Sequence, residues 1–154
     1  MYNKILKNPK YIKANNTIAK LEENRLFCRH DIAHSLDVAR IAYIINLEDK
    51  LGINKNKIYA AALLHDIGRC DTSAEHNISS YKMANIILQE CSYSDEDIAD
   101  ILQAIINHRI TNNNITNLTE LISYADKVAR QCYSCHAYAK CYWQDSKKNK
   151  VIVY

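Results

Sequence analysis

Chain-breaking residues are scarce in this sequence of 154 residues, which contains one proline and two glycines. A strand-rich fold of this length needs many tight turns, and such turns use glycine and proline. The scarcity of both residues therefore favours helices. Hydrophobic residues make up 48% of the chain and charged residues 24%, which suits a single domain with its own hydrophobic core.

Long apolar stretches are also missing, because no run of about 18 apolar residues occurs in the chain. The basic N-terminal stretch MYNKILKNPKYIK lacks the long apolar region and the cleavage site of a signal peptide. We therefore expect no membrane partner, no export and a cytoplasmic location. The formal net charge is only +3, and no dense run of Lys and Arg lies outside the two ends, which disfavours nucleic acid as an obligate partner.

Hydrophobic periodicity and end-capping residues predict six helices. They cover about residues 17–26, 31–49, 54–67, 78–91, 94–109 and 118–139, with a loop at 111–117. Thr17 and Ser94 are expected to be N-caps, and Gly68 is expected to be a C-terminal glycine. The fold class is therefore all-α, a single-domain helical bundle. We expect the domain to cover residues 17–141, with an irregular tail at 1–16 and a tail or short strand at 142–154.

Polar side chains occupy positions in five segments where the helical pattern calls for apolar residues. These side chains are His34, His65 with the adjacent Asp66, His76, His108 and Asp126. A single inward histidine is more often a hydrogen-bonded core residue than a ligand. Six such groups buried separately would be costly, whereas one or two shared cations would compensate all of them. The pattern predicts a metal centre, and nitrogen and carboxylate ligands suit Fe, Mn, Zn, Co or Ni.

The same residues lie in motifs that resemble the HD-domain superfamily of metal-dependent phosphohydrolases. The motifs are HSLDVARIA from His34, LLHDIGR around His65 and Asp66, and YADKVAR around Asp126. The resemblance covers about residues 28–131 and implies a bundle of five or more core helices, with the ligands near its centre.

Members of this superfamily with two metals carry two further histidines, and His76 and His108 stand at the matching positions. The resemblance therefore implies that Asp66 is the catalytic bridge between two ions. His34, His65 and Asp126 would hold one ion, while the two further histidines would hold the other. Hydrolysis of a phosphoester or phosphoanhydride would then proceed through a metal-bound hydroxide.

The substrate implied by the resemblance is a small phosphorylated molecule, with a nucleotide favoured. Cations beside the ligand positions are candidates for phosphate contacts or, equally, solvated surface charges. These cations are Arg69, Arg109, Lys127 and Arg130. Related enzymes that hydrolyse deoxynucleoside monophosphates place a glutamate where Arg69 stands, which argues against that chemistry. The longer GYP signature of cyclic dinucleotide phosphodiesterases is missing from this chain, so cleavage of cyclic dinucleotides is not supported.

A second histidine pair, in HDIAH at residues 30–34, is similar to the H-E-x-x-H motif of metalloproteases. Asp31 replaces the glutamate, and its shorter side chain reaches a metal-bound water poorly. Protease chemistry is therefore disfavoured, and His30 is left as either a pocket residue or a surface residue.

The six cysteines are interpreted as thiols or metal ligands rather than as disulfides. Three fall in the segment CYSCHAYAKCYW, and a fourth precedes the first ligand-bearing helix. Four thiolates of this set would suit a zinc ion or an iron–sulfur cluster, namely Cys28, Cys132, Cys135 and Cys141. His136 is another possible ligand. The alternative to a metal site is that these cysteines are free thiols in a packed helix. Cys70 and Cys91 are expected to be structural.

Two function classes stay open. The first is a metal-dependent phosphohydrolase, which the complete ligand set favours. The alternative is a nucleotide-sensing or redox-responsive regulatory HD module without turnover. The oligomeric state is also open, with a homodimer among the options.

Overall fold

The computed structural model describes residues 1–109 and 114–154, and its regular elements there are all helical. The α-helices are α1 (Pro9–Leu21), α2 (Ile32–Glu48), α3 (Lys55–Leu64), α4 (His76–Glu90), α5 (Asp95–Asn107) and α6 (Leu118–Val128). Short 3-10 helices are η1 (Tyr2–Lys7), η2 (Ile67–Cys70), η3 (Cys132–Ser134), η4 (Tyr138–Lys140) and η5 (Asp145–Lys147). The all-α prediction is confirmed, and part of the expected loop at 111–117 lies outside the described residues.

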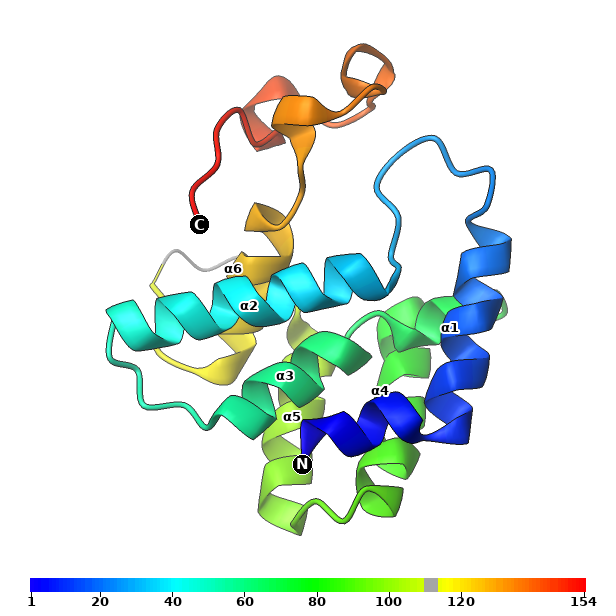
Figure 1. Cartoon of the computed structure of the whole chain (residues 1–154), viewed down its shortest axis with the longest axis vertical. Helices are drawn as coiled ribbons and strands as arrows, with labels where there is room; N and C mark the ends of the chain where they lie inside the picture. Colours follow the sequence, from blue (N-terminus) through cyan, green and yellow to red (C-terminus); the bar gives the residue numbers. More distant parts are fainter. Residues whose placement is uncertain (110–113) are drawn as a thin grey trace.

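Helix α3 lies at the centre of the bundle, in contact with α2, α5 and α6 (Figure 1). Its residues from Ala60 to Leu64 are all buried, whichever face of the helix they occupy. A helix that is buried all round must be apolar all round, as the stretch AAALL is. The polar residues that follow it, His65 and Asp66, therefore emerge inside the molecule.

Side-chain caps fix where several helices begin. The Ser94 hydroxyl accepts a hydrogen bond from the Asp97 amide, so the prediction of Ser94 as an N-cap is confirmed. Asp31 caps α2 by accepting from the His34 amide, and this cap holds the first turn of α2 in place. Thr17 is not a cap, because it lies inside α1 and its hydroxyl donates to the Lys13 carbonyl.

Two predicted helices have the wrong bounds. The first helix begins at Pro9 rather than at residue 17, because Asn8 is its cap and Pro9 suits the first helical position. Ile5 and Tyr11, in the segment expected to be irregular, are buried in the core. The last α-helix ends at Val128 instead of residue 139, and the chain continues as the short helices η3 to η5. The division into a domain and two tails stays a prediction.

No α-helix within the described ranges combines the length and the apolar character needed to cross a membrane.

Gly68 has a different role from the one predicted. Helix α3 ends before it, and Gly68 lies within η2, packed against the start of α4. A Cβ atom there would come within 2.2 Å of the Ser80 amide nitrogen and 2.3 Å of the His76 carbonyl oxygen. The Gly68 amide also donates to the buried Ser80 hydroxyl over 2.8 Å. Glycine is needed here for close backbone approach, which fixes η2 against the first turn of α4.

We expect Gly68→Ala to lower the free energy of unfolding by about 1–3 kcal/mol, because the new methyl group meets backbone atoms that must move. Urea denaturation measures this loss, and hydrogen exchange should show weaker protection in the first turn of α4. Gly52→Ala is the control, since Gly52 has open space around it and a φ of +71°, so its cost is local backbone strain. A Gly68→Ala variant as stable and as well protected as the wild type would contradict this packing.

Candidate metal centre

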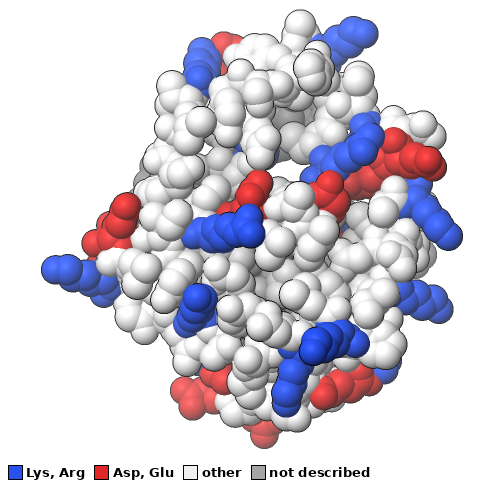
Figure 2. Space-filling model, in the orientation of Figure 1, with Lys and Arg blue, Asp and Glu red and all other residues white. Residues whose placement is uncertain are grey.

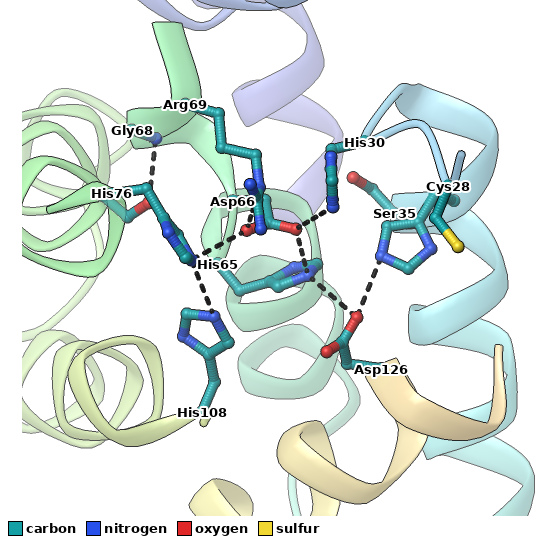
Figure 3. Close-up of polar contacts among 12 residues, drawn as sticks. Cys28, His30, Ser35, His65, Asp66, Gly68, Arg69, His76, His108 and Asp126 are labelled. Carbon is teal, nitrogen blue, oxygen red and sulfur yellow. Dashed lines mark hydrogen bonds and ion pairs between the residues drawn. The ribbon is translucent and has the colours of Figure 1, made fainter. Parts of the chain in front are cut away.

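Six acid and base side chains from different parts of the chain converge in the middle of the bundle (Figure 3). They come from α2 (His34), the end of α3 (His65 and Asp66), the start of α4 (His76), the end of α5 (His108) and the last turn of α6 (Asp126). Each lies at or near a helix end, so the bundle gathers them by pointing helix ends at one place. The sequence had selected the same six residues.

The six residues form two groups, in each of which the ligand atoms all lie within 4.8 Å of one another. One group contains His34, His65, Asp66 and Asp126, and the other contains Asp66, His76 and His108. Asp66 belongs to both groups. Their role as metal ligands stays a prediction, but this sharing is what a pair of ions with one bridging carboxylate requires.

The Asp66 carboxylate faces the two groups with different oxygens. Its Oδ2 atom lies 3.1 Å from His65 Nε2, and its Oδ1 atom lies 3.3 Å from His76 Nε2. The Arg69 Nε also donates to Oδ1 over 2.7 Å. The side chain of Asp66 is only 6% exposed, so these neighbours supply nearly all of its compensation. The carboxylate can therefore offer one oxygen to each of two ions.

Backbone carbonyls orient two of the histidines. His65 Nδ1 lies 2.7 Å from the Ala62 carbonyl oxygen, and His108 Nδ1 lies 2.6 Å from the Ile105 carbonyl oxygen. A carbonyl only accepts, so each Nδ1 carries the proton that it donates. When these imidazoles are neutral, their Nε2 atoms present lone pairs to the centre, as in many protein metal sites.

The buried Nε2 atoms of His34 and His65 lack a hydrogen-bond partner within the part of the chain that the structure describes. His34 Nε2 lies 3.1 Å from Asp126 Oδ1, but the contact does not have the geometry of a hydrogen bond. Buried polar atoms without partners are costly, and this cost disappears if the atoms bind a cation. The donor set therefore fits a divalent metal.

The carboxylates of the first group stay ionised because of His65. Burial disfavours the charged form of His65, but Asp66 and Asp126 outweigh it and raise the pKa of His65 to about 10. Burial also opposes ionisation of both carboxyls, yet His65 holds the pKa of Asp66 well below its usual range. His34 and His65 likewise lower the pKa of Asp126. In the metal-free protein, His65 therefore carries a proton that partly neutralises two carboxylates.

The histidines of the second group are neutral instead. Burial and the positive charge of Arg69 lower the pKa of His76 to about 3. Burial and the charge on His65 also lower the pKa of His108. Their Nε2 atoms lie 3.4 Å apart. Neutral imidazoles are the form that binds metal ions, so this group does not have to lose charge before it takes one.

His30 also lies at the centre, whereas the sequence had left open whether it is a pocket residue or a surface residue. Its Nε2 is 3.9 Å from Asp66 Oδ2, and its Nδ1 lies 2.7 Å from the Glu22 carboxylate. The His30 amide donates to the same carboxylate over 2.7 Å, so Glu22 fixes both the backbone and the ring. The spacing of four residues between His30 and His34 was the available signal. Glu22 was missed, because nothing in its sequence context distinguishes it from a surface acid.

The four predicted phosphate-binding cations lie in different surroundings. Arg69 contacts Asp66, and Arg109 donates to His76 Nδ1 over 2.7 Å and to Glu75 over 3.3 Å. Both therefore lie beside the second ligand group.

The other two cations lie further along the chain, in and after α6. The Lys127 amine donates to the Ser123 hydroxyl over 3.0 Å, and burial lowers its pKa. Arg130 packs on the Trp143 ring, 4.8 Å from its centroid, and lines a cavity on the His34 side of the centre. Arg130 thus lies apart from the second ligand group, while a phosphate role for any of the four stays a prediction.

The four predicted thiolate ligands all line that cavity, which has a volume of about 480 Å³ and is lined by His34 too. His136 lines it as well. Cys70 and Cys91 lie elsewhere, where Cys70 donates to the Met83 sulfur and Cys91 is buried in the core.

We expect Asp66→Asn to bind neither ion tightly, because it removes the shared charge from both groups. His108→Ala should leave one ion per chain, since only the second group loses a ligand. Metal content after loading with Mn²⁺ and desalting, measured by elemental analysis, tests both expectations. His136→Ala is the matched control because it removes an imidazole outside both groups. Two Mn²⁺ ions retained by Asp66→Asn would rule out the bridge.

Metal affinity should rise with pH, because an ion must displace the proton on His65. With a pKa of about 10 in the metal-free protein, His65 is protonated at neutral pH and loses its proton as the pH approaches that value. Each unit of pH below it should weaken apparent affinity by up to about tenfold. Calorimetric titration with Mn²⁺ in two buffers of different ionisation enthalpy measures the protons released. Binding without proton release would contradict a protonated His65.

Comparisons with known proteins agree with these residues. The family model of the HD domain matches residues 31–131, a range that contains all six convergent side chains. An uncharacterized protein of Clostridium beijerinckii is 42% identical over 156 aligned residues, which cover 99% of this chain and 98% of that protein. No solved structure matches the chain. HD domains bind divalent metals, and this chain, matched over most of its length, belongs to the HD-domain family.

Proposed function

We propose that this protein is a metal-dependent phosphohydrolase that acts on a nucleotide or another small phosphoester or phosphoanhydride. One observation carries the proposal: two ligand groups share the Asp66 carboxylate, which turns one oxygen toward each group. Paired divalent ions suit phosphoryl chemistry because they lower the pKa of a bound water and offset negative charge on the reacting phosphate. Membership of the HD-domain family supports the same reaction class.

The residues of the chain hold this centre in a fixed geometry. Asp66 would join the two halves of the centre and keep them at a constant separation. The carbonyls of Ala62 and Ile105 hold the rings of His65 and His108, so that these rings need not reorient during the reaction. A centre arranged in advance stabilises charge that develops on the phosphate without paying for reorganisation.

Cations on the α4 side give a phosphate a place to bind. Arg69 and His76 line an open hollow of about 620 Å³ together with Arg25 and Asp71. Arg69 already contacts Asp66, so a phosphate that reached the second ligand group would meet this guanidinium. We therefore assign substrate entry to this hollow, with Arg69 as a phosphate contact.

Arg109 would change partners when the centre is loaded. Its guanidinium only donates, so the contact with His76 Nδ1 requires that nitrogen to be unprotonated. A neutral histidine that ligates through Nε2 carries its proton on Nδ1, which cannot accept from arginine. Loading would therefore release Arg109 from His76, and its long exposed side chain would become available to a substrate phosphate.

A panel of nucleotides and simple phosphoesters, assayed for phosphate or nucleotide release with Mn²⁺ or Fe²⁺, tests the proposal. We expect turnover by the wild type, loss of at least about a hundredfold in Asp66→Asn, and retained activity in the His136→Ala control. Far-UV circular dichroism should show that both variants keep their helices. Undiminished turnover in Asp66→Asn would eliminate this mechanism. Nucleotide binding with no turnover by the metal-loaded wild type would instead support a sensing module.

A further inference from the structure

Four of the six cysteines line one cavity, although one of them is far from the others in sequence. Cys28 comes from the loop before α2, and the other three come from the segment after α6. All six cysteines are reduced in the structure. Figure 3 shows Cys28 on the Asp126 side of the metal centre, away from His76. Figure 1 shows the C-terminal segment, in orange and red, lying beyond the end of α6 and apart from the main bundle.

The C-terminal segment has little apolar core of its own. Between residues 130 and 154, the buried apolar side chain is Ala137, while Val151, Ile152 and Val153 are exposed. Figure 2 shows the surface hollowed between this segment and the body of the molecule. Segments that cannot bury enough apolar surface are commonly stabilised by disulfides or by a metal site.

Local contacts nevertheless fix the course of the segment. The Asn149 side-chain amide donates to the carbonyls of Lys127, Val128 and Arg130, over 2.8 to 3.0 Å. Phe27 packs edge-on against Tyr142, with ring centroids 5.4 Å apart. This aromatic pair joins the Cys28 loop to the segment that carries the other three thiols. The chain therefore holds both walls of the cavity together.

The separation of the thiols distinguishes between two kinds of metal site. A Zn–S bond of about 2.3 Å places tetrahedral thiolates about 3.8 Å apart. Among the described residues, no three of the four sulfur atoms lie within 4.8 Å of one another. Thiolates around an iron–sulfur cluster bind separate iron atoms and so stand further apart than ligands of one ion. The four sulfur atoms are therefore not gathered around a single point, as the ligands of one zinc ion would be.

Charges around the cavity suit thiolates and the anionic cluster that they would hold. Its lining includes four cations, which are Arg29, Arg130, Lys140 and Lys148, against two acids, Asp31 and Asp37. Packing around Cys28 and the nearby Cys132 thiol raise the pKa of Cys28, and Arg130 only partly offsets this rise. Nearby cations stabilise thiolates, the form of cysteine that binds metals.

We propose that Cys28, Cys132, Cys135 and Cys141 are the thiolate ligands of an iron–sulfur cluster of the [4Fe–4S] class in this cavity. Assembly takes two ferrous ions, two ferric ions and four sulfides from solution, so no further oxidant is needed, and each thiol gives up its proton to solvent as its sulfur bonds to iron. The cluster would connect the loop before α2 to the C-terminal segment. None of the four thiols is among the six convergent residues, although His34 also lines this cavity, and the inference does not depend on the proposed hydrolysis.

The test is anaerobic reconstitution of the whole chain, with its thiols reduced beforehand, in ferrous iron, ferric iron and sulfide, followed by desalting. Acid-labile sulfide is the main readout, because the His and Asp centre could retain iron but has no reason to retain sulfide. We expect about four sulfides per chain, brown colour, and a paramagnetic signal after reduction with dithionite. In a parallel experiment, the protein is loaded with Zn²⁺ in the absence of iron and sulfide, and the retained zinc is measured by elemental analysis.

Cysteine variants decide whether the sulfide belongs to this cavity. Cys28→Ala and Cys141→Ala should each lower retained sulfide at least about fourfold. The controls Cys70→Ala and Cys91→Ala should retain as much sulfide as the wild type. Circular dichroism should show intact helices in all four variants. Equal loss in both pairs would overturn the assignment. Retention of no sulfide by the wild type, or of zinc that is lost in Cys28→Ala and Cys141→Ala, would also overturn it.

Discussion

The buried Asp66 carboxylate is the group on which the centre of this molecule depends. It is 6% exposed and lies among His65, His76, His30 and Arg69. A buried charge needs compensation, and removing one partner from a buried ion pair typically costs about 3–5 kcal/mol. In the metal-free protein, two carboxylates are balanced by the proton on His65 and the charge of Arg69. A divalent ion would replace that proton, so the same arrangement serves folding and metal binding.

The bundle satisfies this constraint by ending its helices at the centre. The last part of α3, from Ala60 to Leu64, must be apolar on every side because it is buried on every side, and polar groups can enter only where the helix stops. Gly68 then lets η2 approach the first turn of α4 closely, which brings His76 toward the Asp66 oxygen that His65 does not face. The position of the second ligand group thus follows from a backbone contact that a methyl group would break.

Residue type and helical spacing were enough to predict the centre, since a histidine such as His34 on an apolar stripe conflicts with burial unless something compensates it. The all-α fold followed from the scarcity of glycine and proline. Helix bounds were less predictable, because the Asn8 cap and the burial of Ile5 depend on contacts made only in the folded chain. Glu22 could not be identified for the same reason. Its partner His30 is eight residues away, and their contact depends on the path of the intervening loop.

The two ends of the centre have different neighbours, and this difference separates their roles. On the His76 side, Arg25 and Arg69 line an open hollow together with three acids, Glu22, Asp71 and Glu75, and this hollow is the substrate entry that we propose. On the opposite side, His34 and the Cys28 loop line the cysteine cavity, and the C-terminal segment contributes the other three thiols to it. A cluster in that cavity would occupy the space over His34 and leave the hollow beside His76 as the substrate's approach. It would also anchor the loop that ends in Asp31, whose carboxylate caps α2 and thereby positions His34. The C-terminal segment would then act on the metal centre through the start of α2, without contributing a ligand to it.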